Sequence, residues 1–213
     1  MMIKPGHILA AAFMAAVVVL SNILVQYPVE ATVGRLQLAD LLTWGAFTYP
    51  FAFFVSDLTN RRYGPRVARL VVLVGFVCAV IVSFKLATPR LAIASGTAYL
   101  VGQLLDISLF ARLRRQAWWR APLAASVVGS VIDTAIFFTL AFAPLAAFLG
   151  PNDAFALESA PLLGVLSIAG ARWMSWALGD LTVKLCAALL LLAPYRALMR
   201  FVLAFPEPQR SPA

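Results

Sequence analysis

The stretch from residue 42 to residue 62 reads LTWGAFTYPFAFFVSDLTNRR. It is apolar and strongly aromatic, yet it contains Pro50 near its centre and Asp57 shortly before two arginines. A run of about 20 apolar residues is long enough for a helix to cross the hydrocarbon core of a membrane, so the stretch predicts a transmembrane helix. Proline and aspartate are both unfavourable inside such a helix, and each therefore suggests a special role.

The composition of the whole chain excludes an ordinary soluble domain. Of its 213 residues, 62% are hydrophobic and only 12% are charged, and the mean hydropathy is +0.90. Soluble domains carry about 25% charged residues. We therefore expect an all-α polytopic membrane protein, a single domain over residues 1–213 with six transmembrane helices. The six segments lie near residues 7–27, 40–59, 66–87, 91–111, 121–148 and 171–198.

The arginines indicate the orientation of these helices. They gather between the second and third segments, between the fourth and fifth, and after the sixth: Arg61, Arg62, Arg66, Arg69, Arg112, Arg114, Arg115, Arg120, Arg196, Arg200 and Arg210. Since Lys and Arg concentrate in cytoplasmic loops, we predict that both termini are cytoplasmic. Lys85 and Arg90 in the third loop argue weakly against this orientation, because that loop is predicted to lie outside. Topology accounts for the net charge of +8, so nucleic acid is not an expected partner.

Two further features concern packing and the outer face. Ala121, Ala125 and Gly129 follow one another at intervals of four, which lets a neighbouring helix approach closely. This neighbour can belong to the same chain or to a second copy in a homo-oligomer, and the spacing leaves both open. The segment 150–170 is too polar and too short to span, so we expect a short interfacial helix on the outer face there, between helices five and six.

Five ionisable residues lie in or near the predicted helices: Asp57, Asp106, Asp133, Asp180 and Lys184. A charge at the centre of a bilayer costs about 2.5–3.5 kcal/mol on insertion scales, so such groups usually face a partner or a watery cavity. Asp133 has no basic residue within two turns of sequence, which favours a polar cavity. Asp106 lies on the same side of its helix as Gln103. A pair with a nearby arginine is the alternative to a functional role for Asp106. Asp180 and Lys184 are four residues apart, so they can neutralise each other or line a substrate path.

Pro50 gives the second helix a reason to bend. Proline cannot donate to the carbonyl of Ala46, so the helix is predicted to kink there, and the freed carbonyl is tolerable where it lines a cavity. Asp57 lies one turn before Arg61. An ion pair at the cytoplasmic boundary explains this aspartate as well as a ligand contact does.

Carboxylates, amides and aromatic rings together suit a planar heterocycle. A carboxylate accepts hydrogen bonds from adjacent N–H donors, and an amide both donates and accepts along a flat polar edge. Aromatic rings can stack on the planar face. Asn22 near the outer end of the first helix is a candidate amide, and Trp44, Tyr49 and Trp176 are candidate stacking residues.

Long motifs in a fixed order carry a family resemblance over nearly the whole chain. They are SNILVQYPV at 21–29, TWGAFTYPFAFFVSDLTNRRYGP at 43–65, GQLLDISLFARLRR at 102–115 and WWRAPLAASVVGSVIDTAIFF at 118–138, followed by the helix of Asp180 and Lys184. With these motifs the chain resembles the queuosine precursor transporter family, also described as vitamin-uptake-transporter-like. The resemblance implies a six-helix inner-membrane protein that takes up 7-cyano-7-deazaguanine, a precursor of the modified tRNA base queuosine. The aminomethyl relative, 7-aminomethyl-7-deazaguanine, is a second candidate substrate.

The resemblance also implies site residues. Positions that the family pattern carries are occupied here by Asn22, Asp57, Gln103, Asp106, Asp133 and Lys184. Deazaguanine presents N1–H and an exocyclic amine side by side, which fits one carboxylate, and we expect Asp133 or Asp106 to read this edge. Its O6 would accept from an amide such as Asn22 or Gln103, or from Lys184, while Trp176 or an aromatic residue of the second helix would stack. A second carboxylate would meet the ammonium of the aminomethyl form or carry a proton.

Two other functions stay open at this point. A substrate-binding subunit would need a separate ATPase chain, because no Walker motif occurs here. An intramembrane enzyme is disfavoured, since His7 is the single histidine and neither a G-x-S-x-G motif nor a metal-ligand cluster occurs. Cys78 and Cys186 lie in apolar segments without metal-type spacing, so we expect no cofactor and no metal.

Overall fold

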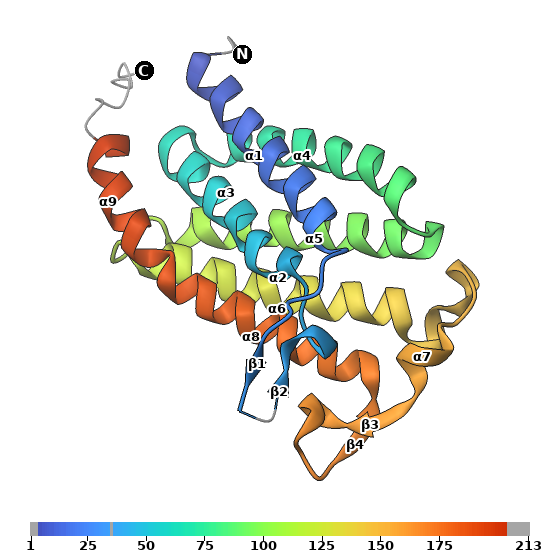
Figure 1. The fold of residues 1–213 in the computed structure, drawn as a ribbon. Helices are drawn as coiled ribbons and strands as arrows, with labels where there is room; N and C mark the ends of the chain where they lie inside the picture. Colours follow the sequence, from blue (N-terminus) through green and yellow to red (C-terminus); the bar gives the residue numbers. More distant parts are fainter. Residues whose placement is uncertain (1–3, 35, 204–213) are drawn as a thin grey trace, which may run out of the picture.

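Long α-helices dominate the structure, a computed structural model that describes residues 4–34 and 36–203 (Figure 1). Within these ranges, five helical stretches are long and apolar enough to cross a membrane. They are α1 (Pro5–Leu24), α4 (Pro65–Leu86), α5 (Pro89–Leu113), α6 (Arg120–Phe142) and the run of α8 (Arg172–Leu190) into α9 (Leu192–Leu203). The all-α prediction is confirmed at this level, with two short β-hairpins added in the loops.

The second predicted helix is divided at the proline. Its pieces are α2 (Trp44–Thr48) and α3 (Pro50–Tyr63), and neither alone reaches membrane-spanning length. Tyr49 between them keeps helical dihedral angles, with φ −58° and ψ −38°. Because Pro50 has no N–H, the hydrogen-bond ladder is interrupted there while the chain continues in a helical direction. The helix is therefore divided at the residue where a kink was predicted, and the kink itself stays a prediction.

Small residues allow α5 and α6 to pack closely along their lengths. A Cβ atom added to Gly102 of α5 would lie 3.3 Å from the carbonyl oxygen of Gly129, and one added to Gly129 would lie 3.3 Å from that of Gly102. Ala121 and Ala125 are fully buried against Phe110 of α5 and the neighbouring α9. The small-residue stripe of the fifth predicted helix thus packs within the chain.

The other half of the bundle joins α1, α3, α4 and α5 through a separate apolar core. Its buried members include Met14, Ala52, Val71, Tyr99 and Ile107. The opposite side of α4 exposes large apolar side chains: Leu73, Val77, Ile81 and Phe84. An apolar outer surface of this kind suits contact with lipid.

Irregular segments fill the loops at one end of the bundle (Figure 1). Between α1 and α2 lie the paired strands β1 (Thr32–Val33) and β2 (Leu36–Gln37), followed by the 3₁₀ turn η1 (Leu38–Asp40). Between α6 and α8 come η2 (Pro144–Leu149), α7 (Ala154–Leu157), β3 (Ser159–Pro161), η3 (Leu162–Gly164) and β4 (Ala169–Ala171). Within residues 150–170 the structure has one helical turn, α7, and the hairpin β3–β4, which was not anticipated; an interfacial helix on the outer face stays a prediction.

The fifth helix ends earlier than its sequence suggests, at Phe142 instead of residue 148. Ala143 is extended, and the buried Arg90 at the start of α5 satisfies the carbonyl groups left open there. Its guanidinium donates to the carbonyls of Leu140, Ala143, Gly150 and Pro151 and to the side chain of Asn152, at 2.7–3.2 Å. This arginine, a counter-signal to the topology, therefore has a structural role.

The described ends of the chain lie at the same end of the bundle. The first turn of α1 and the last turn of α9 are both at the top of Figure 1, opposite the two hairpins. Arg210 lies outside the described residues, and the side chain of Arg200 is likewise not described.

Candidate functional site

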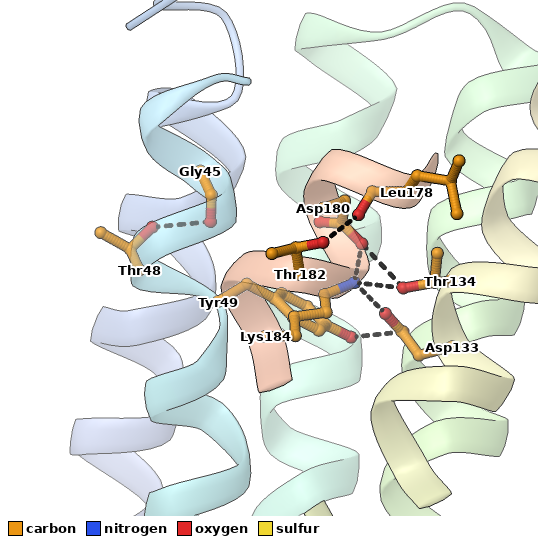
Figure 2. Close-up of polar contacts among 9 residues, drawn as sticks. All are labelled: Gly45, Thr48, Tyr49, Asp133, Thr134, Leu178, Asp180, Thr182 and Lys184. Carbon is orange, nitrogen blue, oxygen red and sulfur yellow. Dashed lines mark hydrogen bonds and ion pairs between the residues drawn. The ribbon is translucent and has the colours of Figure 1, made fainter. Parts of the chain in front are cut away.

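Lys184 of α8 lies at the centre of a buried ion-pair cluster (Figure 2). Its Nζ is 2.7 Å from Oδ2 of Asp133 on α6 and 2.5 Å from Oδ2 of Asp180, one turn earlier on α8. It also donates to the Thr134 hydroxyl at 3.2 Å, and that hydroxyl donates to Asp180 at 2.7 Å. Asp180 and Lys184 thus form the pair that their spacing allows, and Asp133 joins it as a partner distant in sequence.

Tyr49 connects this cluster to the break in the second helix. Its hydroxyl donates to Oδ1 of Asp133 at 2.8 Å, and the ammonium of Lys184 lies 5.0 Å from the centre of its ring. Tyr49 is the residue between α2 and α3, so the helix break and the charged cluster meet at one point. With all three groups ionised, one ammonium faces two carboxylates, and the surplus of acceptors suits a ligand that brings N–H donors.

A cavity of about 480 Å³ opens beside the cluster. Ligand pockets in proteins usually have volumes of about 300–1,000 Å³. Its wall combines the charged cluster with polar side chains from α1 and α5, the loop before α2 and an aromatic group from α6, α7 and α8. The members of the wall that can make polar contacts through their side chains are Ser21, Asn22, Asp40, Thr43, Tyr49, Ser95, Asp133, Arg172, Trp176, Asp180 and Lys184.

The aromatic part of the wall is a packed group: Phe137, Phe138, Phe142, Phe155 and Trp176. The ring centres of Trp176 and Phe142 are 5.3 Å apart at an interplanar angle of 75°. The indole N–H of Trp176 donates to the carbonyl of Asp40 at 2.9 Å, which holds the ring in place. A fixed aromatic group of this kind offers ring faces to a planar ligand.

Six of the ten residues predicted to bind substrate line this cavity: Asn22, Tyr49, Asp133, Trp176, Asp180 and Lys184. The amide of Asn22 is oriented by two hydrogen bonds. It donates to the carbonyl of Val18 at 2.9 Å and accepts from the Ser83 hydroxyl at 3.1 Å. Residues from α1, α6, α8 and the α2–α3 break are therefore brought to one site.

The other four predicted residues lie outside the wall of this cavity. Trp44 is 49% exposed and packs against Phe47. Gln103 is fully buried, and neither atom of its amide is hydrogen-bonded within the described part of the chain. Asp57 and Asp106 lie together inside the bundle, at 2% and 1% exposure.

The ion pair considered for Asp57 and Arg61 does not form among the described side chains. Arg61 donates instead to the Tyr195 hydroxyl at 2.9 Å and to the carbonyl oxygens of Arg114 and Trp118, at 2.5 and 3.5 Å. The guanidinium carbon of Arg61 also lies 5.1 Å from the centre of the Phe110 ring. Arg61 thus ties α3 to the α5–α6 loop and to α9.

Arg172 is a cavity residue that the sequence reasoning missed. It lies at the start of α8, pairs with Glu158 at 3.0 Å and covers the Phe155 ring at 4.4 Å. Its signal was available, because an arginine at the outer end of the sixth segment runs against the positive-inside rule. Nothing in the sequence marks Phe155. Within residues 4–34 and 36–203, no group of three or more His, Cys, Asp or Glu side chains is arranged to hold a metal ion.

Comparison with known proteins identifies the family of the chain. Residues 43–88 and 83–198 match the protein family described as "Putative vitamin uptake transporter". The chain belongs to this vitamin uptake transporter family. No solved structure matches the chain.

Among curated members of the vitamin uptake transporter family, the chain is 33% identical to the "Queuosine precursor transporter" of Escherichia coli (strain K12), over 90% of this chain and 85% of the relative. It is 38% identical to the "Probable queuosine precursor transporter" of Haemophilus influenzae, over 59% of this chain and 65% of the relative. A Bacillus subtilis relative of the same description is 27% identical over 47% of this chain and 56% of the relative. These relatives are named as transporters, not enzymes, and the chain is a multi-pass membrane protein of their family.

Proposed function

We propose that this chain imports 7-cyano-7-deazaguanine, a queuosine precursor, and that the substrate binds in the cavity beside Lys184. The observation that carries the proposal is the convergence of Asp133, Asp180 and Lys184 with an aromatic wall around a space of about 480 Å³. The names of the relatives support the substrate class.

The polar groups of the cavity are complementary to the edge of a deazaguanine. Its N1–H and exocyclic amine form a donor pair for one carboxylate, and O6 accepts from an ammonium or an amide. Asp133 is the proposed edge reader, with Lys184 or Asn22 at O6. Oδ1 of Asp180 accepts no hydrogen bond from any described residue, so it remains open for the ammonium of the aminomethyl form.

The aromatic wall is proposed to hold the planar rings. Trp176 uses its indole N–H on the backbone, so it meets the ligand through its ring face. Tyr49 reaches both Asp133 and Lys184, which places an aromatic ring next to the charged edge. A ligand held this way is stacked on one side and hydrogen-bonded along one edge, an arrangement that favours heterocycles over sugars or inorganic ions.

We further propose that the chain crosses the inner membrane six times, with both termini cytoplasmic. Five stretches qualify as spans by length and apolarity. The start of α1 and the end of α9 lie at one end of the bundle, which requires an even number of crossings (Figure 1). The pair α2–α3, residues 44–63, supplies the sixth, because 20 helical residues extend about 30 Å.

Equilibrium binding to the detergent-purified protein tests the substrate and the site together. The ligand is 7-cyano-7-deazaguanine, and guanine is the competitor. The variants are Asp133→Asn, Asp106→Asn and the matched control Asp153→Asn, whose carboxylate caps α7 and does not line the cavity. We expect Asp133→Asn to raise Kd at least tenfold, the equivalent of about 1.4 kcal/mol, while Asp106→Asn and the control change it less than twofold. Binding that survives in Asp133→Asn and is lost in Asp106→Asn would show that Asp106, inside the bundle, is the carboxylate that binds the N–H edge of the ligand.

Uptake into liposomes containing only this chain completes the test. Accumulation without any second protein is the expected result for a self-sufficient carrier. Absence of binding by the native chain would refute the proposal. Binding without uptake would contradict the self-sufficient carrier.

A further inference from the structure

Two carboxyl groups face each other in the interior of the bundle, away from the wall of the large cavity. Asp57 of α3 and Asp106 of α5 are neighbours, because Ser56 and Asn60 of α3 donate hydrogen bonds to Asp106 and Ile107 of α5, and the two carboxyls interact with each other. Each accepts one serine hydroxyl: Ser126 donates to Oδ2 of Asp57 at 3.4 Å and Ser56 to Oδ2 of Asp106 at 3.1 Å. The other oxygen of each carboxyl, Oδ1, has no hydrogen-bond donor anywhere in the described residues.

Two ionised carboxylates with no proton between them would be highly unfavourable here. Both groups are almost fully buried, at 2% and 1% exposure, and ionised carboxylates only accept hydrogen bonds. A proton on one carboxyl removes the repulsion and supplies the donor that the free oxygens lack. We propose that Asp57 and Asp106 form a proton-binding pair that holds one exchangeable proton and couples its movement to transport.

In the described part of the chain, Arg61 attracts Asp57 electrostatically but forms no ion pair with it, and its hydrogen bonds go to other groups. Arg61 of α3 is bound to the Tyr195 hydroxyl of α9 and to backbone carbonyls. Lys184 of α8 is held between its two aspartates. From α6, the uncharged residues Pro122, Ser126 and Ser130 line the small cavity at Asp57, with Asp133 one turn further along. No ion pair to either member of the proton-binding pair occurs in residues 4–34 and 36–203.

A small cavity is lined both by Asp57 of the pair and by Lys184 of the proposed substrate site. It measures about 20 Å³, enough for about one water molecule. Asp57, Ser126, Ser130 and Lys184 all line it, and Lys184 also lines the large cavity. A water molecule in this small cavity would lie beside both Asp57 and Lys184, and a substrate that draws Lys184 or Asp133 into new contacts changes the electric field at Asp57. A sodium ion is the other occupant that two carboxylates could take, and the transport assay below distinguishes it from a proton.

Infrared spectroscopy reads the proton directly and does not depend on transport. The difference spectrum between the native chain and the double variant Asp57→Asn/Asp106→Asn should contain the C=O stretching band of one protonated carboxyl at neutral pH. Asp153→Asn is the matched control and should give no such band, while the amide bands of the same spectra report whether each variant keeps its helix content. Should the double variant misfold, each single variant replaces it, since each leaves one carboxyl. A difference spectrum without the protonated band would show both groups ionised and overturn the proposal.

Transport assays in liposomes then test the coupling, which rests on the proposed function. Asp106→Asn should retain exchange of labelled for unlabelled 7-cyano-7-deazaguanine within twofold, but lose at least tenfold in accumulation driven by an inside-alkaline pH gradient. Accumulation equal to native, or native accumulation that follows a sodium gradient instead, would overturn the coupling. If the proposed function itself fails, the native chain shows no exchange at all, and the infrared result still decides the proton-binding pair.

Discussion

Replacing Lys184 with Met is expected to be the most destabilising single change in the charged cluster. Lys184 and Asp133 are each 5% exposed, and Asp180 is 16% exposed. Without the ammonium, the two carboxylates retain only the hydroxyl groups of Tyr49 and Thr134 as donors. Removing one partner of a buried pair costs about 3–5 kcal/mol because the other charge is left uncompensated. We expect a loss in that range in the free energy of unfolding.

Asp133→Asn provides the informative contrast. It leaves Lys184 with Asp180 at 2.5 Å, so one charge-assisted hydrogen bond is lost, about 1.5–3 kcal/mol. In the double variant Lys184→Met/Asp133→Asn, one positive and one negative charge disappear together. The double variant should therefore be no less stable than Lys184→Met alone, a coupling of about 1.5–3 kcal/mol.

Reversible unfolding in mixed micelles of mild and denaturing detergent measures these free energies, followed by circular dichroism. The matched control is Thr182→Val on the same helix, whose exposed hydroxyl only bonds the carbonyl of Leu178, and it should change stability by less than about 0.5 kcal/mol. A Lys184→Met variant within about 1 kcal/mol of native, or a double variant as unstable as the sum of the singles, would refute the reasoning.

Three other substitutions test the helix break at Pro50, the hydrogen bonds of Arg90 to the loop after α6, and the hydroxyl of Tyr49. Pro50→Ala should change unfolding by about 1 kcal/mol or less but slow uptake several-fold, and equal losses of both would make the proline merely structural. Arg90→Met should cost about 3 kcal/mol in unfolding free energy, since four carbonyls lose their donor; a neutral result would contradict its role as an anchor. Tyr49→Phe removes the 2.8 Å bond to Asp133 and should cost about 1.5 kcal/mol while weakening precursor binding, with unchanged Kd as the opposing result.

Local sequence was sufficient for the elements that depend on neighbours along the chain. Apolar runs of about 20 residues predict membrane-length helices, and five stretches have the length and apolarity for this. A missing N–H predicts the interruption at Pro50. A spacing of four brings Asp180 and Lys184 to one helix face, and they are paired. These features follow from covalent chemistry and helix geometry alone.

Only the tertiary structure decided which buried charges meet. Asp133 is 51 residues from Lys184, and Asp57 is 49 residues from Asp106, so their contacts depend on how α3, α5, α6 and α8 pack. Both aspartates of the family-like motifs looked alike in sequence as edge readers. Gly102 of α5 leaves room for the Cβ atom of Asp133, and Gly129 of α6 leaves room for that of Asp106, so the two helices approach closely. In this packing Asp133 lines the large cavity, whereas Asp106 accepts a hydrogen bond from Ser56 of α3. Helix periodicity predicts on which face of its helix a residue lies, whereas the packing of the helices determines which residue it contacts.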